Sequence, residues 1–237
     1  MTLDEYKQSG FNTIKGWCDP GLFRALELFD SMLINKTGGC LEIGVHHGKF
    51  FILLNQYSTD TSYAVDVFDD QFLNIDKSGR GSLAIFKENL ERCDLRNGST
   101  TTVIQGDSCD PALDLVSRVG LGKMRFISID GGHTVEHTVN DLVLAQQLIN
   151  NQGVVILDDI LNSHWLGVIE GAGEFLRNRP TLVPFGIGYN KLYMCKISYH
   201  ADYLQTMQSS TDYTKTVKFY GWDCAVLNWQ DGTQSND

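Results

Sequence analysis

Short apolar runs alternate along the chain with longer segments in which apolar residues recur at every third or fourth position. The short runs suit strands buried in a sheet, and the wider spacing predicts one apolar face of a helix. Five runs predict strands at 40–44, 62–67, 101–105, 125–130 and 153–158. Because a helical segment follows each run, the pattern indicates successive β-α units and a doubly wound, mainly parallel sheet.

A hairpin is predicted after these units. Two further strands, at 182–187 and 191–197, are separated only by Gly188, Tyr189 and Asn190, a length typical of hairpin turns. A hairpin adds an antiparallel strand to the sheet. The expected fold class is therefore α/β, with a doubly wound, mostly parallel seven-stranded sheet and one antiparallel edge strand.

The two ends of the chain differ from this central pattern. Residues 1–35 are predicted to form a helical cap, because apolar side chains recur at helical spacing in its second half. This amphipathic segment is also a candidate contact in a homodimer. Residues 198–237 are polar with scattered aromatic residues and are expected to form a C-terminal extension. We therefore expect a single domain over 1–237, with its core at 40–197.

The composition disfavours several classes of partner. The 237 residues include 19 Lys and Arg against 29 Asp and Glu, so the formal net charge is −10. Such a chain repels the phosphates of nucleic acids and anionic membranes. No apolar run approaches the ~20 residues of a membrane span, and the first residues lack the features of a secretory signal. The six cysteines are scattered without a CxxC pair, which is typical of reduced thiols. We expect a cytoplasmic protein that acts on a small molecule.

Ligands of doubly wound sheets bind beyond the carboxyl ends of the strands. Glu42 and Gly44 close the first predicted strand, and Gly48 follows them. The two glycines allow the backbone to turn sharply and to approach a ligand, although such pairs also occur in plain turns. A dinucleotide site needs GxGxxG here, and His46 occupies the place of its second glycine. This difference argues against a nicotinamide dinucleotide.

Acidic residues end the second predicted strand and follow the third. Asp66 lies about twenty residues after the first strand, where a carboxylate accepts hydrogen bonds from both hydroxyls of a ribose. Phe68, just after it, either packs on an adenine or joins the core. Asp107 and Ser108 follow the third strand, where Asp107 either holds an adenine amino group or begins a helix.

The strand ends and the segments around them resemble a known family. In order along the chain they read LEIGVHHG, AVDVF, IQGDS, ISIDGGHTVEHTVNDL and GVVILDDI. Over about 40–197 this set resembles the class I S-adenosylmethionine-dependent methyltransferases. Its IDGxH and DD motifs resemble the branch of metal-dependent O-methyltransferases. The resemblance implies a Rossmann-like methyltransferase fold with S-adenosyl-L-methionine as cofactor.

The resemblance also implies roles for single residues. Glu42 and Gly44 would line the methionine end of the cofactor, Asp66 the ribose, and Asp107 with Ser108 the adenine. An acidic pocket suits the sulfonium cation, and a nucleoside without phosphates needs no glycine-rich phosphate cradle. The predicted cofactor-binding residues are Glu42, Gly44, Gly48, Asp66, Phe68, Asp107, Ser108 and Asp130.

A cluster of acids is expected beside this pocket. Asp130 ends the fourth predicted strand, and Asp158 and Asp159 end the fifth. In the family's strand order these strands are neighbours, so the three carboxylates converge, which is costly unless they are protonated, solvated or bound to a cation. Oxygen ligands favour a hard divalent ion such as Mg²⁺. The alternative is that Asp130 meets the methionine or the substrate without a metal and that the acidic pair caps a turn.

The predicted catalytic residues are His133 and Asp130. His133 follows Asp130 at the start of a predicted helix, and a neutral imidazole with a pKa of about 6.5 suits proton removal near neutrality. The alternative is a side chain that binds backbone at the helix start. The residues and the resemblance together predict metal-assisted O-methylation of a small hydroxylated acceptor, such as a sugar or a phenolic natural product. A nicotinamide-dependent oxidoreductase and a nucleoside-binding protein without catalysis are the alternative functions.

Overall fold

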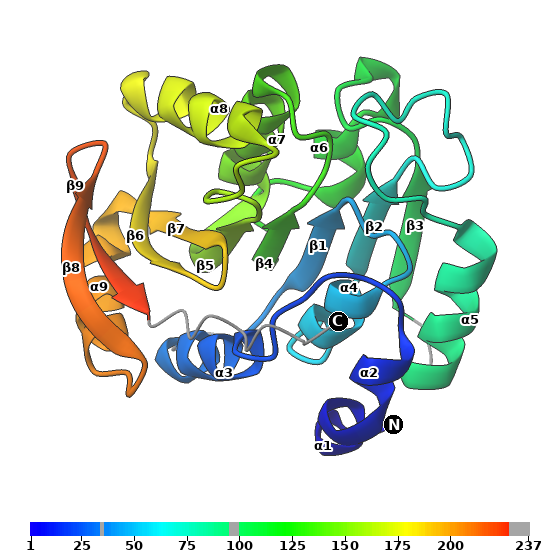
Figure 1. The fold of residues 1–237 in the computed structure, drawn as a ribbon, viewed down its shortest axis with the longest axis horizontal. Helices are drawn as coiled ribbons and strands as arrows, with labels where there is room; N and C mark the ends of the chain where they lie inside the picture. The colour runs from blue at the N-terminus through cyan, green and yellow to red at the C-terminus, as the bar shows by residue number, and fades with distance from the viewer. Residues whose placement is uncertain (34–35, 95–99, 228–237) are drawn as a thin grey trace.

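A single sheet organises the molecule. Within residues 1–33, 36–94 and 100–227, which the computed structural model describes, nine strands pair in the order β3-β2-β1-β4-β5-β7-β6-β9-β8 (Figure 1). The strands are β1 Gly39–Ile43, β2 Ser62–Asp66, β3 Thr101–Gln105, β4 Met124–Ile129, β5 Ile149–Leu157, β6 Leu182–Gly188, β7 Lys191–Lys196, β8 Tyr213–Phe219 and β9 Trp222–Leu227.

Most neighbouring strands run parallel. β7 runs antiparallel to β5 and β6, and β8 runs antiparallel to β9. The predicted α/β class with a doubly wound, mostly parallel sheet is confirmed. The sheet is nevertheless wider than predicted, because the described residues form nine strands instead of seven. The antiparallel β7 consequently lies inside the sheet and not at its edge.

The two additional strands come from the C-terminal segment. Gly186 and Ile187 of β6 pair in parallel with Ala225 and Val226 of β9, and β8 then covers the outer side of β9. Most side chains of β8 are polar and exposed, so the strand lacks the alternation of apolar and polar residues that predicts a half-buried strand. The wider sheet could not be predicted for this reason.

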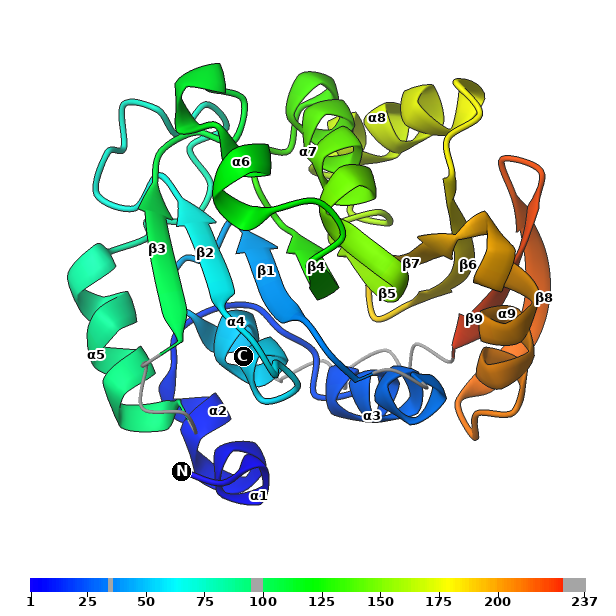
Figure 2. The same ribbon diagram turned by 180° about the vertical axis from the view of Figure 1, so that it is seen from behind.

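Helices cover both faces of the sheet (Figures 1 and 2). α3, α4 and α5 lie on one face, and α6, α7 and α8 lie on the other. The helices are α1 Leu3–Glu5, α2 Phe11–Thr13, α3 Leu22–Met32, α4 Lys49–Asn55, α5 Leu83–Cys93, α6 Leu115–Val119, α7 Val135–Leu148, α8 Leu166–Arg177 and α9 His200–Gln208, with a π-helical turn at Tyr6–Gly10 and 3-10 turns at Pro111–Leu113 and Ile197–Tyr199.

Alternate side chains of the strands pack into two separate cores. In β1, Cys40 packs on the side of α3 and α4, whereas Leu41 packs on the side of α7. The ring centroid of Phe29 in α3 lies 5.0 Å from that of Tyr193 in β7 and 5.5 Å from that of Phe185 in β6. The apolar face of α3, which suggested a dimer contact, is therefore buried within the chain.

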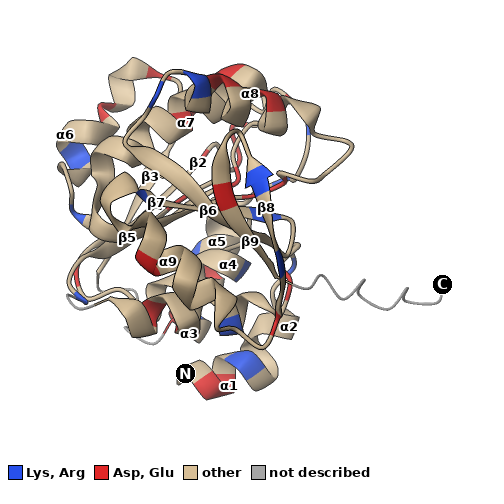
Figure 3. Cartoon of the chain, turned by 90° about the vertical axis from the view of Figure 1, so that its left-hand side faces the viewer, with Lys and Arg blue, Asp and Glu red and all other residues tan. Residues whose placement is uncertain are grey.

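The predicted cap and extension both adjoin the core. Residues 34–35 of the predicted cap and 228–237 of the predicted extension lie outside the described residues. None of the described helices has both the length and the apolarity needed to cross a bilayer. Figure 3 shows acidic residues on α1 and both acidic and basic residues on α8.

Arg125 of β4 fastens the N-terminal cap to the sheet. Its side chain is 2% exposed, and its guanidinium donates a hydrogen bond to the Asp30 carboxylate in α3. It also donates to the backbone carbonyls of Tyr57 and Lys36, the latter at 3.1 Å. The planar guanidinium group thereby links β4 to the segment that contains Asp30 and Lys36 and to the segment that contains Tyr57.

Arg125→Met is expected to lower the free energy of unfolding by about 2–4 kcal/mol, because Asp30 and two carbonyl groups each lose a charged donor. Urea unfolding followed by circular dichroism measures the change. Lys123→Met removes an exposed basic side chain next to β4 and should leave the stability nearly unchanged. Equal stabilities of the two variants would contradict the anchoring role of Arg125.

Candidate functional site

A cavity of about 570 Å³ opens where the parallel strands end. Five strand ends contribute to its wall: Gly44 after β1, Asp66 in β2, Asp107 after β3, Asp130 after β4 and Asp159 after β5. The strand order brings these predicted residues together, because the carboxyl ends of neighbouring parallel strands share one edge of the sheet.

The turn after β1 depends on two glycines. Gly44 has φ +86°, and a Cβ there would lie 1.7 Å from the carbonyl oxygen of Asp130. Only glycine therefore allows the ends of β1 and β4 to approach so closely. Gly48, with φ +89°, precedes α4, where a Cβ would lie 2.7 Å from the Phe86 ring. Gly48 does not line the cavity, so its predicted cofactor contact is replaced by a packing role.

Two predicted cofactor contacts are buried in the protein instead of lining the cavity. Phe68 is fully buried and stacks on Phe86 with a centroid distance of 5.6 Å, so it joins the core and offers no face to an adenine. Glu42 is 2% exposed in β1, beside Ser128 of β4. Burial, reinforced by the nearby charge of Asp130, raises the pKa of Glu42 well above its usual value. Sequence alone did not show that these side chains are buried.

Asp66 lines the cavity and also organises the turns around it. Its Oδ2 accepts hydrogen bonds from the backbone N–H groups of Val45 at 2.6 Å and His46 at 2.7 Å. Its Oδ1 accepts one from the N–H of Phe68. Burial raises the pKa of Asp66, and these three donors oppose the rise. These hydrogen bonds hold the Asp66 carboxylate in a fixed orientation beside the segments that follow β1 and β2.

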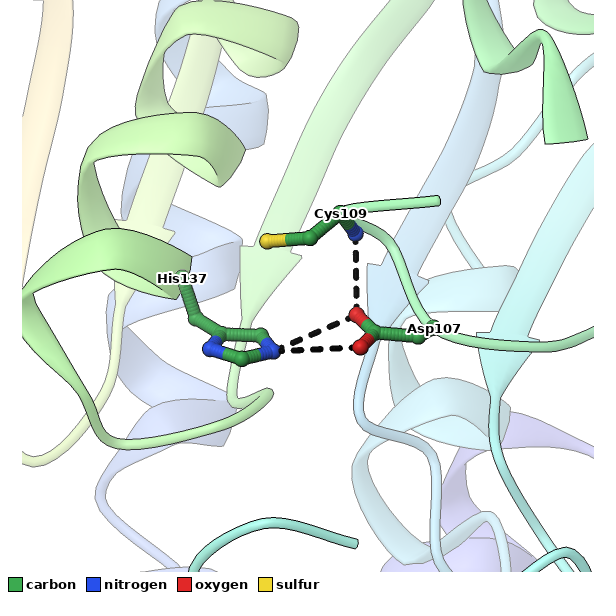
Figure 4. Close-up of side chains that lie close together, drawn as sticks. All are labelled: Asp107, Cys109 and His137. Atoms are coloured by element: carbon green, nitrogen blue, oxygen red, sulfur yellow. Dashed lines mark hydrogen bonds and ion pairs between the residues drawn. The ribbon is translucent and has the colours of Figure 1, made fainter. Parts of the chain in front are cut away.

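Asp107 meets a histidine at the end of the cavity near β3. Figure 4 shows the ring of His137, from the first turn of α7, directed at the Asp107 carboxylate, with Nε2 3.2 Å from Oδ1. The backbone N–H of Cys109 donates to the same oxygen at 2.9 Å. Thr134, the N-cap of α7, lies 2.8 Å from the other ring nitrogen of His137 and fixes the ring. Ser108 also lines the cavity.

Asp107, Cys109 and His137 form one of two described groups whose ligand atoms lie within 4.8 Å of one another, as a metal site would require. Burial, reinforced by Asp141, raises the pKa of the Cys109 thiol to about 12. Without a bound ion the thiol therefore stays protonated at neutrality, and a protonated thiol is a weak metal ligand. This group is better suited to accepting a hydrogen bond at Asp107 than to holding an ion.

The second group is the acidic corner, formed by Asp130, His133 and Asp159. Nε2 of His133 lies 3.0 Å from Oδ2 of Asp159 and 3.5 Å from Oδ1 of Asp130. Its Nδ1 lies 2.5 Å from Oδ2 of Asp76. The imidazole also stacks on Trp165, with a centroid distance of 4.5 Å. One histidine ring thus lies among three carboxylates in the cavity wall.

The comparison with protein families decides which kind of chain this is. Residues 41–160 match the family described as a methyltransferase domain, and this segment contains the ends of β1 to β5 that line the cavity. This chain belongs to the methyltransferase domain family. The predicted resemblance is thereby confirmed. No functionally curated protein matches the sequence of this methyltransferase.

Solved methyltransferases share the fold at low sequence identity. An O-methyltransferase from Bacillus cereus, solved in complex with SAH, is 17% identical with a TM-score of 0.58, covering 81% of this chain and 88% of its own. The O-methyltransferase NovP is 17% identical with a TM-score of 0.56, covering 74% of this chain and 80% of its own. MycE, solved with Mg, SAH and mycinamycin VI, is 14% identical with a TM-score of 0.52, covering 83% of this chain and 53% of its own.

The acidic corner of this methyltransferase keeps His133 protonated. Burial alone would lower the pKa of His133, but hydrogen bonds with Asp130, Asp159 and Asp76 outweigh it and raise the pKa to about 11. The neutral imidazole that we expected from the sequence is therefore not the resting form in this arrangement. The difference arises because the sequence placed Asp130 and Asp159 in the acidic cluster but did not reveal that Asp76 lies against the other ring nitrogen of His133.

Asp158 stands apart from the acidic corner. Its carboxylate forms an ion pair with the ammonium group of Lys191, whose side chain is 3% exposed. Burial raises the pKa of Asp158 to about 7, and the charge of Lys191 opposes this rise. The predicted metal triad is thus only partly assembled, since Asp130 and Asp159 converge while Asp158 is held by a lysine.

Three site residues of the methyltransferase are not among those predicted from the sequence. Asp76 lies in the loop between β2 and α5, and His137 and Lys191 would ordinarily be solvated or packed side chains. Each meets its carboxylate partner only through tertiary structure. Lys191 had one usable signal, because it begins the second strand of a predicted hairpin whose turn lies near the site.

In methyltransferase treated with a chelator, His133 is expected to remain protonated well above neutral pH. Its raised pKa stabilises the folded state fully below about pH 6.5, and this contribution is lost only as the pH rises through about 11. Nuclear magnetic resonance of ¹⁵N-labelled imidazole groups measures the protonation directly.

The matched variant for this measurement is Asp76→Asn. It removes one of the three carboxylates around His133 and should lower the titration midpoint of His133. A midpoint near 6.5 in the unmodified protein, the ordinary value for histidine, would contradict this account of the acidic corner.

Proposed function

We propose that this chain is an S-adenosyl-L-methionine-dependent O-methyltransferase that acts, with a divalent cation, on a small acceptor carrying neighbouring hydroxyl groups. The proposal depends on one observation, which is that two pairs of carboxylates line the same cavity in a chain of the methyltransferase family. Asp66 and Asp107 line one part of it, and Asp130 with Asp159 line another. The first pair suits a nucleoside, and the second suits a positive charge.

The cofactor part of the proposal uses the carboxylates beside β2 and β3. Asp66 would accept hydrogen bonds from the ribose hydroxyls, since it lines the cavity and its oxygens carry lone pairs beyond those used by backbone donors. Asp107 would accept one from the adenine amino group, and His137 would keep its carboxylate in place. The Bacillus cereus enzyme and MycE, both solved with SAH, support this class of ligand.

The acidic corner fits a hard divalent cation such as Mg²⁺. Two carboxylates and one imidazole offer ligand atoms within 4.8 Å of one another, and oxygen ligands are those that Mg²⁺ prefers. The presence of Mg in the MycE complex supports the proposal. Asp130 and Asp159 would hold the ion. When bound, such an ion lowers the pKa of a coordinated hydroxyl group.

Residues of the chain would then orient the reactants and accept the proton of the acceptor's hydroxyl group. The bound cofactor supplies an electrophilic methyl group on a sulfonium. His133 can accept the acceptor's proton at Nε2 only in its neutral form. Asp130 and Asp159 keep it protonated at rest, whereas carboxylates engaged with another cation no longer do so. Asp76 at Nδ1 and Trp165 against the ring would fix the imidazole's orientation.

The acceptor side of the cavity is partly apolar. Trp17 and Ile75 line the cavity, and their side chains are 79% and 61% exposed. Large exposed apolar side chains beside a polar cavity suit an acceptor with a ring or an apolar body, such as a sugar unit or a phenolic natural product. Family membership favours methyl transfer over the hydride transfer of a nicotinamide-dependent enzyme.

Asp66→Ala is expected to weaken binding of S-adenosylhomocysteine by at least about tenfold, because the ribose loses a charged hydrogen-bond acceptor. Isothermal titration calorimetry measures the affinity. Asp70→Ala, a carboxylate of the same loop that does not line the cavity, is the control and should bind normally. Unchanged affinity in Asp66→Ala would reject the ribose role.

Asp159→Asn is expected to abolish the rise in melting temperature that Mn²⁺ or Mg²⁺ produces in the presence of S-adenosylhomocysteine. The amide removes the charge that holds the ion. Asp223→Asn, whose carboxylate pairs with Lys218 away from the cavity, should keep the full rise. Absence of any rise in the unmodified protein would show that the cation is not part of the function.

A further inference from the structure

Lys191 is an unusual component of an acidic cavity. It is the first residue of β7 and is 3% exposed. Of the cavity-lining residues that the structure describes, it alone is a lysine or arginine. A lysine loses its hydration on burial and is retained only when a partner compensates its charge. Its position therefore calls for an explanation in terms of the groups around it.

The strand register determines the partner of Lys191. β5 and β7 are antiparallel and Leu157 pairs with Leu192, so Asp158 and Lys191 lie opposite each other as the two strands leave the paired region. The ammonium group forms an ion pair with Oδ2 of Asp158. It also lies 4.9 Å from the centroid of the Phe50 ring, on the side of α4. The backbone thus fixes this pair beside the acidic corner.

The pair changes the charge that a cation meets in the cavity. Asp130, Asp158 and Asp159 would together present three negative charges, the arrangement expected of a tight divalent site. Lys191 compensates one of these charges by pairing with Asp158, and its ammonium group also interacts electrostatically with Asp130. A positive charge so near a dication repels it strongly in a partly desolvated cavity.

We propose that Lys191 acts as an internal counter-cation that occupies Asp158 and thereby weakens binding of a divalent cation at the acidic corner. Lys191 is a positioning residue in this role, because it acts through Asp158 and not on the reacting groups. The inference rests on the proposed function, in which Asp130 and Asp159 hold the ion. Under this proposal Asp130 and Asp159 bind the ion in the resting protein, while the Asp158 carboxylate remains paired with Lys191.

The proposal is tested by titrating the protein with Mn²⁺ alone, without cofactor or acceptor. Electron paramagnetic resonance measures the concentration of free Mn²⁺, which gives the affinity. Lys191→Met should bind Mn²⁺ at least about tenfold more tightly than the unmodified protein, because a repelling charge is removed and Asp158 is released. The double variant Lys191→Met with Asp158→Asn should lose most of this gain.

Two controls separate charge from packing. Lys191→Arg keeps the positive charge and should bind Mn²⁺ within about threefold of the unmodified protein. Lys196→Met removes a lysine from the other end of β7 and should also leave the affinity unchanged. Should Lys191→Met fail to fold, Lys191→Gln removes the charge while keeping a hydrogen-bond donor for Asp158, and the same gain is expected.

Each outcome bears on a different part of the account. Equal or weaker Mn²⁺ binding in the uncharged variants, with clear binding in the unmodified protein, would overturn the role of Lys191 and leave the proposed function intact. Absence of Mn²⁺ binding in every variant would overturn the role of Lys191 together with the cation site. Calorimetry with S-adenosylhomocysteine tests the cofactor site separately, because it needs no metal.

Discussion

Several carboxylates crowd one edge of the sheet, and each of them requires a compensating partner. Burial and mutual repulsion both oppose their ionised forms. Asp66 is compensated by backbone N–H groups, Asp158 by the ammonium group of Lys191, and Asp130 with Asp159 by the imidazolium of His133. Glu42 has its pKa raised well above the usual value, which favours its neutral form. The arrangement of the cavity follows from this need for positive charge and donors.

The same constraint suits the cavity for cationic ligands. A sulfonium cofactor and a divalent ion both bring positive charge to a region where protein groups supply an excess of negative charge. The backbone creates that region, because Gly44 allows the ends of β1 and β4 to approach each other and so brings the acids of adjacent strands together. Under the proposed function, the resident cations on Lys191 and His133 would set how strongly an external cation binds.

Much of the architecture could be predicted from the sequence, because its signals are local. The five β-α units and the acids that end their strands follow from apolar runs and from what comes directly after each run. Asp66, Asp107, Asp130 and Asp159 accordingly meet at one cavity as expected. Family motifs strengthened this prediction, and the match over residues 41–160 confirms the family.

What the sequence did not reveal depends on tertiary structure. Phe68 has a positive φ and turns into the core, which no pattern of residues indicates. Lys191 meets Asp158 through the register of an antiparallel strand pair, and Asp76 meets His133 through a loop without periodicity. The β8–β9 hairpin escaped prediction because an exposed edge strand carries mostly polar side chains.

A crystal structure of the protein with S-adenosylhomocysteine and Mn²⁺, using the anomalous signal of manganese, tests the central claim most directly. The account predicts the adenine beside Asp107, the ribose hydroxyls on Asp66, and an anomalous peak coordinated by Asp130 and Asp159. A nucleoside bound away from these strand ends, or manganese found only outside the cavity, would contradict it.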